Sequence, residues 1–188
     1  ALTNRRDMLS RCFRKPEGKP MTETRHAGGC MCGAIRYEAD RDPRFSALCH
    51  CHMCQQWSGS AMLGTAAFDR DAVVFTAGEP KVFWSSDVCE RGFCGDCGSS
   101  LFTRYSSGGA FDVVLFVGLG TLDDPEIAPP DVHYGAEGEL SWMRRDDGLT
   151  RICIDVIDPA EQNALFEKML ATSTDHVASK PAATGETS

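Results

Sequence analysis

The stretch Gly28-Gly29-Cys30-Met31-Cys32-Gly33 supplies two thiols, and Cys94-Gly95-Asp96-Cys97-Gly98 supplies two more. Together these four cysteines have the number and spacing of the ligands that hold a structural zinc. The two pairs lie more than sixty residues apart. A shared zinc would therefore fasten the beginning of the sheet to its middle and replace core that a thin β domain lacks. Disulfides or buried free thiols are the alternative, and we predict zinc.

The local conformation of each pair can also be predicted. In a strand, positions i and i+2 point to the same side, so a strand would present the sulfurs of Cys30 and Cys32 to one ion while Met31 faces away. Cys94 and Cys97 are expected to form a knuckle. Gly98 can adopt the positive φ that aims backbone N–H groups at the sulfurs.

A third cluster, Cys49-His50-Cys51-His52-Met53-Cys54, places three thiols within six residues, so seven of the ten cysteines lie in clusters. Three thiolates leave a fourth zinc position for water, a histidine or a substrate, which is the arrangement of catalytic zinc. We predict a second zinc held by Cys49, Cys51 and Cys54, with a position that a substrate can reach.

The fourth ligand of this second zinc is the open question. Cys89 would close the site with a fourth thiolate, and His52 would close it with an imidazole; either would make the site structural. His50 lies between two ligands, so in an extended segment its ring points to the opposite face.

Length and composition favour one small domain. The chain has 188 residues and 42% hydrophobic residues, enough for one core. We expect a flexible arm over residues 1–25, an ordered zinc-binding domain over 26–171 and a disordered tail over 172–188. The beginning of the chain shows no apolar stretch resembling a signal peptide, so we expect a cytoplasmic protein in which clustered cysteines bind metal.

The charge of the chain limits the classes of partner that we expect it to bind. A formal net charge of −8 argues against nucleic acid, because phosphate backbones attract basic surfaces. The most apolar run, 113–120, is too short to cross a bilayer, so no membrane partner is expected. A small anionic substrate could still meet the local arginines, which are Arg36, Arg91, Arg104, Arg144 and Arg145.

The pattern along the chain is mainly β, with little helix. Short alternating or apolar runs predict strands at 35–37, 73–75, 82–84, 100–105, 111–117 and 151–157, separated by turn residues at 77–80 and 106–109. The last two runs before residue 120 are predicted to form a hairpin. One helix is predicted with Asp158 as N-cap and Pro159 at its first position, continuing through Met169. A shorter helix is expected after Cys54.

The roles of several other residues can be predicted less specifically. Cys12 is expected to be inert in the arm, and Cys153 to be a small side chain in a strand. His133 follows a Pro-Pro turn and is expected to be a surface histidine, although it could reach a site. Trp57 and Trp142 are more typical of a core than of a pocket.

The three cysteine segments with their flanking residues resemble one family. They are Gly28-Gly29-Cys30-Met31-Cys32-Gly33-Ala34-Ile35-Arg36-Tyr37, Cys49-His50-Cys51-His52-Met53-Cys54-Gln55-Gln56-Trp57-Ser58-Gly59 and Arg91-Gly92-Phe93-Cys94-Gly95-Asp96-Cys97-Gly98-Ser99-Ser100-Leu101. The family is that of the glutathione-dependent formaldehyde-activating enzymes, which share their domain with centromere protein V. His133 and Leu140-Ser141-Trp142 are similar to its closing motif, so the resemblance covers about residues 26–145.

The resemblance implies a β-tent of antiparallel sheets. It implies a structural zinc on Cys30, Cys32, Cys94 and Cys97 and a catalytic zinc on Cys49, Cys51 and Cys54. It also implies a carbon–sulfur lyase acting on adducts of glutathione with formaldehyde.

Two other function classes remain. One is a non-catalytic zinc-stabilised protein-binding module. The other is a zinc-stabilised methionine sulfoxide reductase, which would leave Cys49 and Cys51 unexplained.

Overall fold

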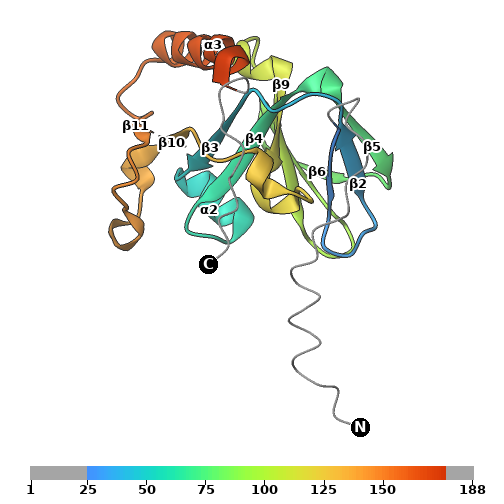
Figure 1. Cartoon of the computed structure of the whole chain (residues 1–188). Coiled ribbons are helices and arrows are strands. Elements are labelled where there is room, and N and C mark those ends of the chain that lie inside the picture. The colour runs from blue at the N-terminus through green and yellow to red at the C-terminus, as the bar shows by residue number, and fades with distance from the viewer. Residues whose placement is uncertain (1–24, 177–188) are drawn as a thin grey trace, which may run out of the picture.

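The computed structural model of the protein describes residues 25–176, and within them the fold is mainly β (Figure 1). A three-stranded antiparallel sheet has the order β1-β2-β5. Its strands are β1 (His26–Gly29), β2 (Arg36–Ala39) and β5 (Val73–Ala77).

An eight-stranded sheet has the order β11-β10-β3-β4-β9-β8-β7-β6. Its strands are β3 (Phe45–Cys49), β4 (Leu63–Asp69), β6 (Lys81–Ser86), β7 (Cys89–Phe93), β8 (Ser100–Tyr105), β9 (Val114–Gly118), β10 (Val132–Tyr134) and β11 (Thr150–Ile152). Strand β10 runs parallel to both of its neighbours, and the other pairs are antiparallel.

Two α-helices and six short 3₁₀ turns complete the described part. The helices are α2 (His52–Ser58) and α3 (Pro159–His176). The 3₁₀ turns are η1 (Arg70–Ala72), η2 (Ala110–Val113), η3 (Leu119–Thr121), η4 (Pro125–Ile127), η5 (Ala136–Gly138) and η6 (Ser141–Met143). Neither helix is long and apolar enough to cross a membrane.

The central strands β4 and β9 supply side chains to two separate apolar clusters, because alternate residues of a strand point to opposite faces. Ala66 and Phe68 pack with Tyr37 of β2 in a cluster that joins the two sheets. Ala67 and Phe116 pack on the other face in a cluster that Phe166 of α3 covers. In Figure 1 the helix α3, at the red end of the colour bar, lies across one end of the larger sheet.

The structure confirms the mainly β prediction, the β8–β9 hairpin and the start of α3. Asp158 Oδ1 accepts hydrogen bonds from the backbone N–H groups of Ala160 (2.8 Å) and Glu161 (3.0 Å), as an N-cap should. The helix then runs to His176, beyond the boundary expected at residue 171. Helix α2 begins at His52 rather than after Cys54.

Three other local predictions are wrong. Cys30 and Cys32 lie in the turn after β1, not in a strand. The first part of the predicted 111–117 strand belongs to η2. The predicted 151–157 strand ends at Ile152, because its neighbour β10 has only three residues. Beyond that point the N–H of Ile154 donates to a carboxylate oxygen of Glu137 (3.0 Å) instead of to a strand.

Candidate metal centres

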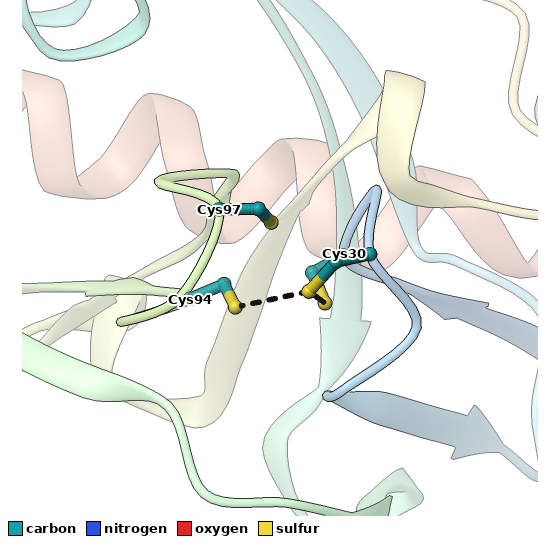
Figure 2. A group of neighbouring side chains, drawn as sticks. Cys30, Cys94 and Cys97 are labelled. Atoms are coloured by element: carbon teal, nitrogen blue, oxygen red, sulfur yellow. Dashed lines mark hydrogen bonds between the residues drawn. The ribbon is translucent and has the colours of Figure 1, made fainter.

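The first centre gathers four sulfurs from two distant turns. The Sγ atoms of Cys30, Cys32, Cys94 and Cys97 all lie within 4.8 Å of one another. Figure 2 shows Cys30, Cys94 and Cys97 converging from two separate loops. The Cys30–Cys32 and Cys32–Cys94 sulfur distances are 3.4 and 3.8 Å. A disulfide needs about 2.05 Å; all four thiols are free and close enough to share one ion.

Both turns have the same construction, which explains why the first pair is not in a strand. The N–H of Gly33 donates to the carbonyl of Cys30 (3.1 Å), and the N–H of Gly98 donates to the carbonyl of Cys94 (3.0 Å). Gly33 and Gly98 have φ values of 79° and 75°, a region that glycine adopts without steric cost. The predicted knuckle at Cys94 therefore has a matching knuckle at Cys30.

The donors around these sulfurs suit a metal-bound thiolate. Backbone N–H groups of Ile35 and Asp96 point at the sulfurs of Cys30 (3.2 Å) and Cys94 (3.4 Å). The Ser99 hydroxyl lies 3.2 Å from the sulfur of Cys97. That hydroxyl, with nearby backbone N–H groups, lowers the pKa of Cys97 to about 6. Four thiolate-type ligands in this arrangement fit zinc.

The second centre is built where β3 passes into α2. Cys49 ends β3, Cys51 precedes the helix, and Cys54 lies in its first turn. The carbonyl of Cys51 accepts hydrogen bonds from the N–H groups of Cys54 (3.0 Å) and Gln55 (3.1 Å), which folds the segment back on itself. The three sulfurs lie within 4.8 Å of one another. Cys49 and Cys54 are buried and Cys51 is half-buried.

Neither proposed fourth ligand belongs to this three-sulfur group in the part of the chain that the structure describes. Cys89 is buried in β7. His52 is exposed, and its Nδ1 lies 3.5 Å from the side-chain oxygen of Gln55. Between residues 25 and 176 the group therefore offers three protein ligands, against four in the first centre.

A buried arginine lies beside the second centre. Arg91 is only 2% exposed, and its two terminal nitrogens lie 3.8 and 3.9 Å from the sulfur of Cys54. Its Nε donates to the hydroxyl of Ser85 (3.0 Å). A buried guanidinium needs an anionic partner, and a negative charge on the three-sulfur group would provide one. Hydrogen bonds from the Cys49 and Cys54 thiols lower the pKa of Cys51, and the charge of Arg91 acts in the same direction.

This position of Arg91 corrects the expectation that it meets a substrate. Arg36 and Arg104 are engaged as well, since Arg36 pairs with Asp123 (2.9 Å) and Arg104 pairs with Glu90. Arg144 and Arg145, in contrast, are exposed after η6.

His50 and His133 form a buried pair behind the second centre. His50 Nε2 and His133 Nδ1 are 2.7 Å apart, and His133 Nε2 lies 2.9 Å from a carboxylate oxygen of Asp147. The histidines are 1% and 3% exposed, so the surface reading of His133 is wrong. Val132 and Tyr134 of β10 face the apolar cluster under α3, which turns His133 to the opposite side of the strand. His50 points away from the three sulfurs, as predicted.

A ligand atom of Glu139 lies within 4.8 Å of the ligand nitrogens of both histidines, but its carboxylate accepts from Nε of Arg151 at 3.1 Å. The group therefore forms an ion-pair and hydrogen-bond network that holds the segment between Cys49 and Cys51. The sequence did not predict this network as a whole, because its members come from the residue after β3, from β10, from the loop that follows β10 and from β11.

Two of the tryptophans and the unclustered Cys153 lie outside both centres. Trp57 packs edge-to-face on Phe93 at 5.9 Å, whereas Trp142 is 72% exposed and is not a core residue. Cys153 is half-buried just after β11. Cys12 lies outside the described residues.

The model of the family described as "Glutathione-dependent formaldehyde-activating enzyme" matches residues 25–136, which include all seven clustered cysteines. The chain belongs to this family. An uncharacterized lyase of Schizosaccharomyces pombe is 32% identical to it over 83 residues, which are 44% of this chain and 60% of the yeast protein. A crystal structure of a Rhodobacter sphaeroides protein is similar over 52% of this chain and 87% of that chain, with a TM-score of 0.43 and 17% identity.

Proposed function

We propose that the protein is a zinc-dependent carbon–sulfur lyase acting on adducts of glutathione with an aldehyde, of the S-hydroxymethylglutathione type. One observation carries this proposal: the Cys49, Cys51 and Cys54 cluster offers three sulfurs, whereas the other cluster offers four. Membership of the formaldehyde-activating family and the similarity to a protein named as a lyase support it.

The proposed reaction is the addition of a thiol to a carbonyl and its reverse. In the forward direction the sulfur forms a bond to the carbonyl carbon, the carbon–oxygen π bond breaks, and the thiol proton ends on the oxygen as a hydroxyl. In the lyase direction the carbon–sulfur bond breaks and these movements are reversed. Neither direction oxidises or reduces anything, so no electron carrier is needed.

We assign a structural zinc to Cys30, Cys32, Cys94 and Cys97, and a catalytic zinc to Cys49, Cys51 and Cys54. The catalytic zinc would keep a substrate thiol ionised at neutral pH, since a thiol has a pKa of about 8.5 and a metal deprotonates one that coordinates it. Arg91 holds a positive charge against Cys54, and the His50–His133 pair fixes the backbone between the other two ligands. Exposed Arg144 and Arg145 are available for the carboxylates of glutathione.

The proposal places the reaction in the cytoplasm, where glutathione is abundant, with an aldehyde and a thiol as small-molecule partners and with neither nucleic acid nor membrane involved. The catalytic unit is the domain expected over residues 26–171.

The test compares one cysteine from each centre. Cys51→Ala should abolish turnover of the glutathione–formaldehyde adduct while the protein still unfolds cooperatively and keeps one zinc per chain. Wild-type protein should contain two zinc ions. After cobalt substitution, glutathione should perturb the spectrum of the ion that Cys51→Ala loses. Equal loss of folding in Cys51→Ala, or two ions whose spectra ignore thiols, would contradict a catalytic role.

A zinc-stabilised protein-binding module is the second candidate, and one observation favours it. Strand β6 lies at the edge of the larger sheet, and Val82, Phe83 and Trp84 on it are 44%, 57% and 52% exposed. Exposed aromatic residues on an edge strand are typical of a surface that pairs with another chain. Full zinc content without turnover or thiol binding would favour this module over the enzyme.

A further inference from the structure

A small, partly enclosed apolar chamber adjoins the second centre. Its volume is about 50 Å³, and Cys49 and Cys54 form part of its wall. Aromatic rings make up most of the remaining wall: Phe45, Tyr105, Phe111, Phe116, Tyr134 and Phe166. The Thr103 hydroxyl, also in the wall, accepts a hydrogen bond from Arg91, and the Tyr134 hydroxyl accepts one from Gln162. The chamber therefore suits a carbon chain better than a polar group.

The three sulfurs are divided between this chamber and the solvent. Cys49 and Cys54 line the chamber and are 8% and 7% exposed. Cys51 does not line it and is more accessible. A thiol arriving from solvent would thus approach the three sulfurs on the Cys51 side. A second reactant bound at the same sulfurs would face the chamber on the opposite side, which Cys49 and Cys54 line.

The helix α3 forms one side of this chamber, although it lies outside the residues that the family model matches. Phe166 of α3 is 2% exposed and meets Phe45 edge-to-face with ring centroids 5.0 Å apart. Two polar contacts hold the helix in place: Asn163 Oδ1 accepts from the N–H of Ala110 (2.7 Å), and Gln162 reaches Tyr134. The wall contributed by Phe166 is therefore a feature of this chain beyond the shared domain.

We propose that this chamber receives the alkyl group of a short aliphatic aldehyde, and that Phe166 limits the length of that group. The inference rests on the proposed function, since it names the aldehyde class for the same reaction. An engineered apolar cavity of about 150 Å³ holds benzene, so a chamber of about 50 Å³ holds roughly two carbon atoms. Acetaldehyde and propanal fill it, pentanal exceeds it, and formaldehyde leaves it empty.

The test uses the zinc-loaded full chain with glutathione and a series of aldehydes from formaldehyde to pentanal. The measured quantity is the ratio of kcat/KM for pentanal to that for acetaldehyde, compared between variants so that the intrinsic reactivity of each aldehyde cancels. Phe166→Ala should raise this ratio about tenfold or more, because each buried methylene group contributes about fourfold. Leu170→Ala is the matched control. Leu170 packs against the same apolar cluster from α3 but does not line the chamber, so its ratio should stay within about twofold.

A second measurement separates the chamber from the reaction. The cobalt-substituted protein is titrated with ethanethiol and pentanethiol, and binding is followed by the cobalt absorption. Phe166→Ala should improve pentanethiol binding relative to ethanethiol by a similar factor, and Phe166→Leu, which keeps more of the volume, by less. If no aldehyde is turned over but pentanethiol binding improves relative to ethanethiol, the proposed reaction is wrong and the proposed role of the chamber is supported. If aldehydes are turned over but neither ratio moves in Phe166→Ala or Phe166→Leu, the chamber proposal is overturned.

Discussion

Cutting the link between the two turns of the four-cysteine centre should lower the free energy of unfolding by about 4 kcal/mol. The perturbation is the double variant Cys30→Ser and Cys32→Ser, which removes one pair of sulfurs and leaves Cys94 and Cys97 in place. Serine has nearly the same shape as cysteine. The N–H of Ile35 that now points at the Cys30 sulfur can donate to the new hydroxyl, so little packing is lost.

The magnitude follows from the length of chain that the metal would close. Cys32 and Cys94 are 62 positions apart. In the chain-entropy description a cross-link across about 60 residues removes roughly 14 cal/mol/K from the unfolded state, or about 4 kcal/mol at 25 °C. Domains of this size are stable by about 5–15 kcal/mol, so the change is large enough to measure and leaves many such domains folded.

The assay is urea unfolding at equal protein and excess zinc, with zinc content measured on each sample. Met31→Ala is the control, because Met31 lies in the same turn, is 84% exposed and is no ligand. It should change the free energy of unfolding by less than about 0.5 kcal/mol. Cys51→Ala should also cost less than the double variant, because its cluster spans only residues 49–54 and closes no long loop. If the double variant is as stable as Met31→Ala, the four-cysteine centre does not tie the sheets together.

Three further predictions concern the groups around the second centre. Arg91→Met should weaken zinc binding at the three-cysteine centre by about 10- to 100-fold in a chelator competition, because it removes the cation beside Cys54; equal weakening at the four-cysteine centre would refute this reasoning. His133→Ala should lower the free energy of unfolding in urea by about 2–4 kcal/mol, because buried His50 and the Asp147 carboxylate each lose a partner; a loss below about 0.5 kcal/mol would show that water replaces the ring freely. His133 lowers the pKa of Asp147 to about 2, so this carboxylate stabilises the fold fully above its unfolded pKa near 4, and that contribution is lost as the pH falls towards 2. The difference in urea midpoint between wild type and Asp147→Asn should therefore be constant above about pH 5 and shrink below pH 4, and a difference that grows on acidification would contradict the assignment.

The two cysteine centres could be predicted because their ligands occur in three short cysteine motifs and the chemistry of these motifs is specific, although the two pairs of the four-cysteine centre are distant in sequence. The strands could be predicted where both faces are apolar, as in β9, or where a turn separates two runs, as in β8 and β9. The strand prediction failed where an alternating segment had no neighbouring strand to pair with. Ile152, Ile154 and Val156 alternate as in a strand, yet Val156 is 77% exposed because β10 offers only three residues to pair with.

The surroundings of the second centre depend on contacts that no local pattern contains. Arg91 is 37 positions from Cys54, and its local sequence is that of an ordinary arginine in a strand. Only the order of the strands in the sheet brings its side chain to the Cys54 sulfur. His133 becomes a buried partner of His50 because β10 inserts parallel beside β3. Phe166 reaches the chamber from a helix beyond the family match. The cysteines thus indicate which metal chemistry is available, whereas the shape of the chamber beside them depends on side chains brought there by the tertiary fold. Under the proposed function, relatives with the same seven cysteines are expected to differ in the aldehyde they accept wherever the segment corresponding to α3 differs.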